Sequence, residues 1–205
     1  LPIWQCKKCK KLEVIGSLED LLSQKFSNNN YFFFRHGHSL RQVKNVAMCW
    51  PEKIICPLTK KGEREVKISA KKLKSQKIDI IFSSDLLRTK QTAEIMAKET
   101  GAKIIFDKRL REFNVGIFNG KPPELTWEYL TKQKNLFLAK PPKGESLIQI
   151  QKRMHSFLKE INKKYQNKNI VIISHELPLT ILDGTLKGLS LEKILEWRKQ
   201  TKESK

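Results

Sequence analysis

The sequence predicts an α/β fold in which a mostly parallel sheet lies between two layers of helices. Two observations lead to this expectation. Short apolar runs rich in β-branched and aromatic residues alternate with longer segments of helical periodicity. Strands separated by helices typically form parallel sheets covered on both faces. The length of 205 residues fits one such domain with a short additional segment.

Four short segments have the composition of buried strands. They are Tyr31–Phe34, Ile78–Phe82, Lys103–Phe106 and Asn169–Ser174. Each is an apolar run that is too short for a helix of typical length. In such sheets ligands bind beyond the carboxyl ends of the strands, so a functional site is expected at that edge.

Three longer segments have helical spacing. Leu58–Ser75 carries Val66 and Ile68 on its expected apolar face, and Thr59 suits its N-cap. Asp85–Thr100 is followed by a glycine that suits the C′ position, Gly101. Ser146–Tyr165 is the most amphipathic, with the apolar residues Leu147, Ile150, Met154, Phe157, Leu158 and Ile161. The stretch Gly116–Pro142 contains prolines and aromatic residues, and no helix is assigned to it.

The composition indicates a globular protein with a basic surface. Hydrophobic residues make up 39% and charged residues 30% of the chain, and the formal net charge is +20. The apolar runs are too short to span a bilayer and no signal segment opens the chain. We therefore expect a cytoplasmic protein with no membrane partner and with cysteines that are reduced or metal-bound. Lysines greatly outnumber arginines, which is typical of a solvated surface that attracts phosphorylated substrates, although RNA contact stays open.

Two histidines directly follow the first and the last predicted strands. His36 lies in an Arg-His-Gly tripeptide that begins at Arg35, and His175 follows the last strand. Arg88 follows the second strand and Glu112 follows the third. All are therefore expected near one edge of the sheet.

This set of side chains suits phosphoryl transfer. A neutral imidazole, here His36, is a nucleophile near pH 7. Arg35 and Arg88 can hold the transferred group by forked, charge-assisted hydrogen bonds, and His175 can add another donor. Glu112 can protonate the leaving oxygen. Since these groups replace a metal, no cofactor is expected for this chemistry.

Five segments, in this order, resemble the successive signatures of the histidine phosphatase (phosphoglycerate mutase-like) superfamily. They are FFRHGHS at 33–39, SDLLRTKQTA at 84–93, LRE at 110–112 with glycines at 116 and 120, GES at 144–146, and VIISH at 171–175. The resemblance covers about residues 31–190, and five ordered blocks are far more specific than one tripeptide. It implies a phosphoglycerate mutase-like three-layer fold. It also implies His36 as nucleophile, Arg35, Arg88 and His175 as the phosphate pocket, and Glu112 as proton donor.

The chain departs from this family pattern at three positions, the first of which is His38, where the family commonly has Glu. The family usually has Asn six residues after the nucleophile, where this chain has Gln42, and Asn45 can substitute after a shift of the loop. Both are candidate substrate-binding residues, together with Ser39. Glu176 stands where many small members have Gly. A carboxylate directly after the second histidine resembles the acid phosphatase branch, so Glu176 is a candidate substrate-binding residue and a rival of Glu112, the favoured acid.

The first thirty residues have a different resemblance. Cys6 and Cys9 form a C-x2-C knuckle, half of a four-thiolate zinc site, and the chain has no second such pair. Residues 1–22 resemble the zinc-knuckle segment of an isoleucyl-tRNA synthetase, a class I enzyme. Residues 23–30 suit a linker to a phosphatase domain at 31–205. The chain is thus interpreted as a fragment of a longer protein. Ligands from outside this chain would complete the zinc site, and tRNA would be bound only through the larger parent protein. The alternative is that these residues form a short zinc-binding or solvated N-terminal arm.

The sequence therefore predicts metal-independent hydrolysis of a small phosphorylated metabolite through a phosphohistidine on His36. A phosphoglycerate-type mutase would use the same intermediate, but the loop from Lys121 to Lys143 is shorter than the substrate-enclosing insertions of dedicated mutases. A non-catalytic module of an isoleucine-tRNA ligase fragment is the third interpretation, and the intact set of catalytic side chains argues against it.

The other arginines and cysteines are given structural roles. Arg64, Arg109 and Arg153 are expected on solvated faces. Cys49 and Cys56 fit no ligand spacing and are interpreted as small buried or loop residues.

Overall fold

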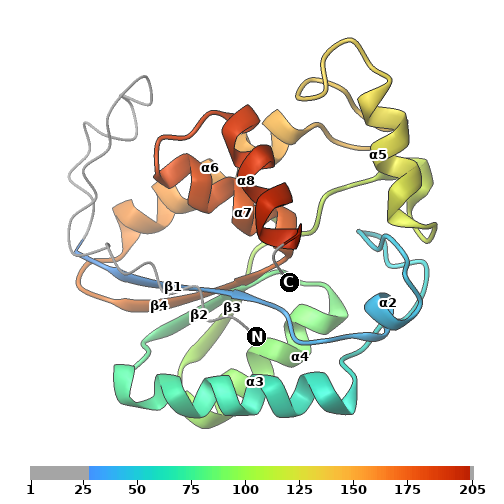
Figure 1. Ribbon diagram of the computed structural model, residues 1–205. Helices are drawn as coiled ribbons and strands as arrows, with labels where there is room; N and C mark the ends of the chain where they lie inside the picture. The colour runs from blue at the N-terminus through green and yellow to red at the C-terminus, as the bar shows by residue number, and fades with distance from the viewer. Residues whose placement is uncertain (1–27, 204–205) are drawn as a thin grey trace.

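The computed structural model describes residues 28–203. Within them a four-stranded, fully parallel sheet lies between two layers of helices (Figure 1). The strand order is β1 (Asn30–Arg35), β4 (Asn169–Ser174), β2 (Ile80–Ser83) and β3 (Lys103–Phe106). The predicted zinc knuckle at Cys6 and Cys9, all of residues 1–22 and most of the linker lie outside the described residues.

The register of the sheet aligns the carboxyl ends of its strands. Arg35 at the end of β1 pairs with Ser174 at the end of β4, and Ser83 at the end of β2 pairs with Ile173. The ladder continues one step further, because the amide of His36 donates to the carbonyl of Ser174 at 3.2 Å. Residues that follow these strands therefore emerge side by side.

Each face of the sheet is covered by its own group of helices. Helices α3 (Lys60–Leu73) and α4 (Leu87–Thr100) cover one face, and α6 (Leu147–Lys164) and α7 (Glu176–Leu186) cover the other, followed by α8 (Leu191–Glu203) (Figure 1). Alternate strand residues enter the two cores: Phe32 and Phe34 pack with the first pair, and Phe33 with the second. This alternation follows from the two-residue repeat of a strand.

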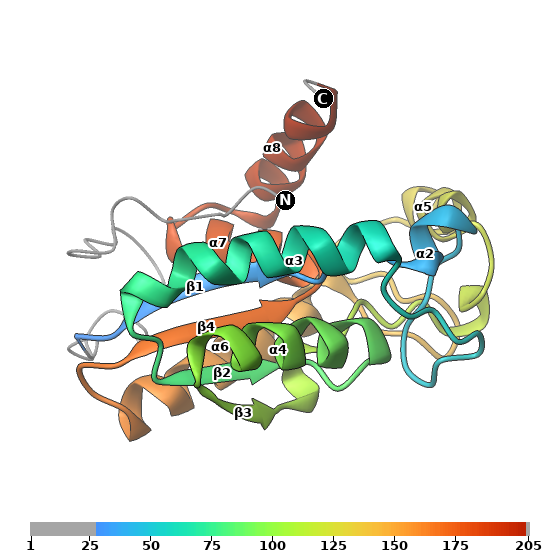
Figure 2. The ribbon, with the colours of Figure 1, turned by 90° about the horizontal axis from the view of Figure 1, so that it is seen from below.

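Short elements lie beyond the carboxyl ends of the strands. Helix α2 (Leu40–Val43) follows β1, and α5 (Pro123–Thr131) belongs to the long connection between β3 and α6. Figure 2 shows both at the end toward which the strand arrows point. Three 3-10 turns complete the described elements: η1 (Lys74–Gln76), η2 (Lys108–Leu110) and η3 (Gly116–Phe118).

Most of the predicted elements are confirmed. All four strands and the three helices are present, with ends that differ by a few residues. Thr59 caps α3 by accepting a hydrogen bond from the amide of Gly62, and Gly101 follows α4 with a left-handed φ of 76°. All six apolar residues predicted for α6 are buried.

Two expectations about helices were wrong. Ile68 is 58% exposed, and the smaller Ala70 is buried on α3 instead. The Pro-containing stretch, to which no helix was assigned, forms α5, because Pro123 stands at its first position, where the missing amide proton costs nothing. Among the described residues, no helix is both long and apolar enough to cross a membrane.

Candidate active site

The two strand-end histidines lie next to each other. His36 directly follows β1 and His175 directly follows β4, the neighbouring strand. Their ring centroids are 5.3 Å apart, and both side chains are buried. The structure therefore brings these two predicted residues together at the carboxyl edge of the sheet.

The surroundings of His36 leave one ring nitrogen without a proton. Nδ1 lies 2.8 Å from the carbonyl oxygen of Gly37, so it must donate the proton. Nε2 then accepts from Nε of Arg88 at 3.2 Å. Burial, followed by the charges of Arg88 and Arg35, lowers the pKa of His36 well below its usual value. The ring is therefore neutral near pH 7, with the lone pair on Nε2.

The glycine after His36 is required by packing. A Cβ at Gly37 would lie 2.7 Å from Cγ2 of Val66 and 3.0 Å from the carbonyl oxygen of Gly62, both on α3. Atoms do not approach so closely. The last residue of the Arg-His-Gly tripeptide thus lets α3 pack directly against the loop that carries His36.

Arg88 links the two histidines. Its Nη2 lies 3.0 Å from both the carbonyl oxygen of Met48 and Nδ1 of His175, and its Nη1 lies 3.3 Å from Oε1 of Glu52. Burial lowers the pKa of Arg88 to about 10, against the opposing negative charges of Glu112 and Glu52. The guanidinium is still positive near pH 7, so the site has a fixed buried cation.

Glu52 is a site residue that the sequence reasoning missed. It lies in the loop between α2 and α3, with its side chain 16% exposed. Besides its contact with Arg88, its Oε2 accepts from the amide of Leu87 at 2.8 Å, at the start of α4. A carboxylate is favourable at a helix N-terminus. Nothing in the local sequence marks Glu52, because it belongs to no periodic segment and to none of the five blocks.

His175 is held as the opposite tautomer to His36. A guanidinium cannot accept a hydrogen bond, so Nδ1 of His175 accepts from Arg88. Nε2 then carries the proton and donates to Oγ of Ser84 at 3.0 Å. Burial and the charge of Arg88 lower the pKa of His175 well below its usual value. The predicted role of His175 as a phosphate donor stays a prediction, because neither nitrogen offers a free N–H here.

Glu112 lies beside the histidine pair. Its Oε2 is 3.8 Å from Nδ1 of His175, its Oε1 accepts from the amide of Phe113 at 2.9 Å, and its side chain is 12% exposed. Arg153 supports this loop from α6 by donating to the carbonyl oxygen of Glu112 and, at 2.9 Å, to Oε1 of Glu145. Glu145, which belongs to the fourth family-like segment, and Arg153 thus form a clasp that supports the loop of the predicted acid, Glu112.

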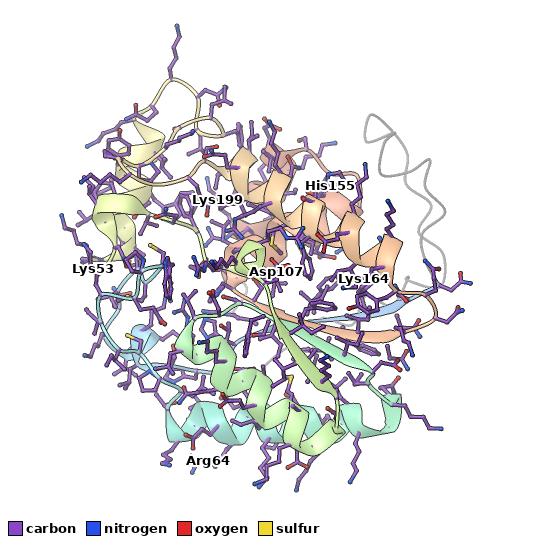
Figure 3. All side chains as sticks on the ribbon, turned by 180° about the vertical axis from the view of Figure 1, so that it is seen from behind. Lys53, Arg64, Asp107, His155, Lys164 and Lys199 are labelled. Atoms are coloured by element: carbon purple, nitrogen blue, oxygen red, sulfur yellow. The ribbon has the colours of Figure 1, made fainter. Side chains whose placement is uncertain are left out.

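The expectation of solvated arginines was wrong for Arg153. Its side chain is only 17% exposed, since it is enclosed by this clasp. Arg109 is also partly enclosed and pairs with Asp107 at 2.6 Å and with Glu160 at 2.8 Å. Arg64 is exposed on α3, on the outer side of the molecule (Figure 3).

Glu176, the rival acid, is engaged by an arginine. Oε1 and Oε2 of Glu176 accept from Arg198 of α8 at 2.6 Å and 3.1 Å. The guanidinium of Arg198 in turn lies 5.2 Å from the ring centroid of Trp127 on α5. A bidentate guanidinium contact stabilises the ionised carboxylate, so this contact favours Glu176 as a structural anion.

The remaining predicted pocket residues, Ser39, Gln42 and Asn45, differ in burial and in their hydrogen bonds. Oε1 of Gln42 accepts from the amide and from Oγ of Ser39, each at 2.8 Å. Ser39 is buried, whereas Asn45 is exposed with a left-handed φ of 48°. The amide oxygen of Gln42 therefore closes the first turn of α2, and none of these contacts points to a phosphate group.

Two further arginines have unsatisfied donors near His36. The Nε atoms of Arg35 and Arg41 are buried and have no hydrogen-bond partner among the described residues. Burial lowers the pKa of Arg35, which is partly offset by the negative charge of Glu176. Arg41 was not singled out from the sequence. Buried donors without partners are rare in folded proteins, so these two call for an acceptor from outside the protein, such as a ligand, an ion or water.

The chain is similar to known proteins both in sequence and in fold. The family profile described as "Histidine phosphatase superfamily (branch 1)" matches residues 31–203. The probable phosphoglycerate mutase GpmB of Yersinia enterocolitica is 35% identical over 163 residues, which cover 77% of this chain and 74% of the relative. YhfR of Bacillus stearothermophilus superposes with a TM-score of 0.73 at 24% identity, over 81% of this chain and 83% of that one. A mycobacterial glucosyl-3-phosphoglycerate phosphatase complexed with VO3 gives 0.67 at 21% identity, over 79% and 82%. The two solved structures establish the shared fold.

Proposed function

Because the chain belongs to the histidine phosphatase superfamily (branch 1), we propose that it hydrolyses phosphomonoesters through a phosphohistidine on His36. One observation carries this proposal. Nε2 of His36 is unprotonated and lies 3.2 Å from Nε of the buried Arg88. A nucleophile and a fixed cation for the incoming phosphoryl group are therefore adjacent before substrate binds.

The proposed reaction has two displacements at phosphorus. In the first, Nε2 of His36 bonds to phosphorus while the ester P–O bond breaks, and Glu112 gives a proton to the leaving oxygen. In the second, water attacks the phosphorus, the carboxylate of Glu112 takes a proton from that water, and the N–P bond breaks. Nδ1 of His36 keeps its hydrogen bond to the carbonyl of Gly37 throughout. Neither step requires a metal or an organic cofactor.

Glu112 is the better candidate for this acid than Glu176. Oε2 of Glu112 lies 3.8 Å from His175 and makes no hydrogen bond with an arginine among the described residues, so it can hold a proton. Both oxygens of Glu176 accept from Arg198, and protonation would sacrifice that contact.

A phosphoglycerate-type mutase is the second candidate. It is favoured by the printed name of the Yersinia relative, a probable phosphoglycerate mutase. Hydrolysis is favoured by the length of the connection that contains α5, because a short connection leaves water access to the phosphohistidine. We expect a small phosphorylated metabolite as substrate, attracted by the positive charge of the protein.

The test uses the purified chain with p-nitrophenyl phosphate and, separately, with 3-phosphoglycerate. We expect release of inorganic phosphate, and a loss of activity to background in His36→Ala. His155→Ala is the matched control, since His155 lies on α6, a helix that covers one face of the sheet (Figure 3), and was given no catalytic role. Equal rates in wild type and His36→Ala would refute the proposal. Isomerisation of 3-phosphoglycerate without phosphate release would instead support the mutase.

The N-terminal segment calls for a separate proposal. We propose that Cys6 and Cys9 bind zinc only when ligands from outside this chain complete the site, as in a larger synthetase-like parent through which tRNA would be bound. Cys49 and Cys56 are buried, which makes them poor candidates for the missing thiolates. The zinc content of the dilute monomeric chain tests this. Less than one zinc per chain is expected, and one zinc per chain that disappears in Cys6→Ser would contradict the proposal.

A further inference from the structure

The hydrogen-bonding capacity of Arg88 is largely used within the protein. A guanidinium has five N–H groups. Nε–H contacts His36, one Nη1–H contacts Glu52, and the two on Nη2 contact Met48 and His175. One Nη1–H stays open, and Nε–H becomes available when Nε2 of His36 bonds to phosphorus. Arg88 can therefore offer about two donors to the three outer oxygens of a phosphoryl group.

One other expected donor, His175, is also committed within the protein. Nδ1 of His175 accepts from Arg88, and its Nε2–H is directed to Ser84. Gln42 stands where the family usually has a phosphate-binding Asn; its amide oxygen accepts from Ser39, and this contact leaves the NH2 group of Gln42 as a donor. Arg35 keeps a buried Nε without a partner among the described residues, so Arg35, Gln42 and about two N–H groups of Arg88 are the donors that the family pattern supplies here. The three outer oxygens of a phosphoryl group are strong acceptors, which leaves room for a further donor.

Arg41 has the properties that a further donor requires. It lies on α2, immediately before Gln42, and the backbone of α2 is anchored because the amide of Leu40 donates to Pro57 at 3.0 Å. Nε of Arg41 is buried without a hydrogen-bond partner among the described residues. Its positive charge is also among the smaller causes, after burial, that lower the pKa of His36 and of Arg88. A buried donor without an acceptor is unfavourable unless a ligand provides one.

We propose that Arg41 binds the phosphoryl group that is transferred, in the place that the family gives to an asparagine six residues after the nucleophile. This assignment rests on the proposed function. Arg41 would supply charge-assisted hydrogen bonds to the outer oxygens, whose negative charge must be held while the P–O bond breaks. The positively charged guanidinium of Arg41 would then take the role of the neutral asparagine amide. The affinity for a phosphate dianion would therefore depend more strongly on Arg41 than it does on the asparagine of the family.

The test compares Arg41→Ala and Arg41→Lys with Arg64→Ala, a control on the exposed side of α3 (Figure 3). Phenyl phosphate is the substrate because it carries no second acidic group, and orthovanadate is the probe of the pocket. In Arg41→Ala we expect kcat/KM to fall and vanadate binding to weaken, each roughly 10- to 100-fold. Arg41→Lys should recover part of both losses, since it retains the charge, and Arg64→Ala should equal wild type.

Three results would overturn the assignment. The first is wild-type kcat/KM and vanadate affinity in Arg41→Ala. The second is a loss confined to substrates with a second acidic group, which would place Arg41 at another part of the substrate. The third is an Arg64→Ala variant that loses as much as Arg41→Ala, which would indicate a general effect of charge. Vanadate affinity is measured by direct titration, so this readout stands even if His36→Ala shows that hydrolysis does not depend on His36. Circular dichroism verifies that each variant is folded.

Discussion

Replacing Glu52 with alanine is expected to destabilise the protein and to slow catalysis. The substitution removes the acceptors of Nη1 of Arg88, at 3.3 Å, and of the amide of Leu87, at 2.8 Å. Breaking a fully buried ion pair costs about 3–5 kcal/mol. Glu52 is 16% exposed and its contact with Arg88 is long, while Arg88 keeps its contacts with Met48 and His175. We therefore expect a loss of about 2 kcal/mol in the free energy of unfolding, or a roughly 30-fold larger unfolding constant.

The assay is urea unfolding followed by circular dichroism, together with kcat for p-nitrophenyl phosphate. Because Arg88 loses one of its anchors, kcat should fall about 10-fold. Glu52→Gln keeps an acceptor oxygen and should lose about half as much stability. Glu63→Gln on α3 is the control, since Glu63 is 41% exposed and, within residues 28–203, pairs only with Lys60 at 3.4 Å, a contact of little energetic value. Stability and kcat in Glu52→Ala equal to those of Glu63→Gln would refute the reasoning.

Three further predictions concern other parts of the site and its support. Ser146→Ala should lower the free energy of unfolding by about 1 kcal/mol, since Oγ of Ser146 caps α6; an unchanged urea midpoint would contradict this. Because the pKa values of His36 and His175 are lowered in the folded state, the unfolded chain takes up protons first as the pH falls below about 6.5. Stability should therefore be complete above that pH and decrease below it by up to about 1.4 kcal/mol per pH unit for each histidine. His175→Asn should reduce this slope, and an identical slope in that variant would exclude His175 as a source. Glu112→Gln should lower kcat roughly 100-fold with an alkyl phosphate but much less with p-nitrophenyl phosphate, whose leaving group needs no proton, while Glu176→Gln should leave both near wild type. The opposite ranking of the two variants would make Glu176 the acid.

The sequence was most informative where function depends on strand ends. His36, Arg88, Glu112 and His175 were predicted to converge because the carboxyl ends of parallel strands share one edge, and the observed register brings them together. The apolar pattern of α6 was equally reliable, since a long amphipathic helix has many positions that indicate the same buried face. The same logic failed for Ile68, where a single apolar residue was taken as part of the buried face.

The loop between α2 and α3 could not be predicted from the sequence. Its path is set by contacts with residues more than sixty positions away: the amide of Ala47 donates to Lys121 at 2.8 Å, and the amide of Cys49 donates to Oδ1 of Asn119 at 3.1 Å. Such contacts leave no periodic signal. Glu52 comes from this loop, so its contact with Arg88 became visible only in three dimensions.

The charges of the site serve two requirements that would otherwise conflict. Binding of a phosphate group would need several guanidinium groups around His36. Burial, followed by the charges of Arg88 and Arg35, lowers the pKa of His36. A protonated His36 could not attack phosphorus, so burial and these cations together favour the neutral form that the proposed reaction requires. The cost is a buried positive charge on Arg88, which Glu52 and Glu112 offset. Glu52 stands on the side of Arg88 that faces the helix N-terminus of α4, whereas Glu112 stands beside the histidines. Glu52 can therefore be committed to holding the arginine while Glu112 stays available for the proton exchange that we propose for it.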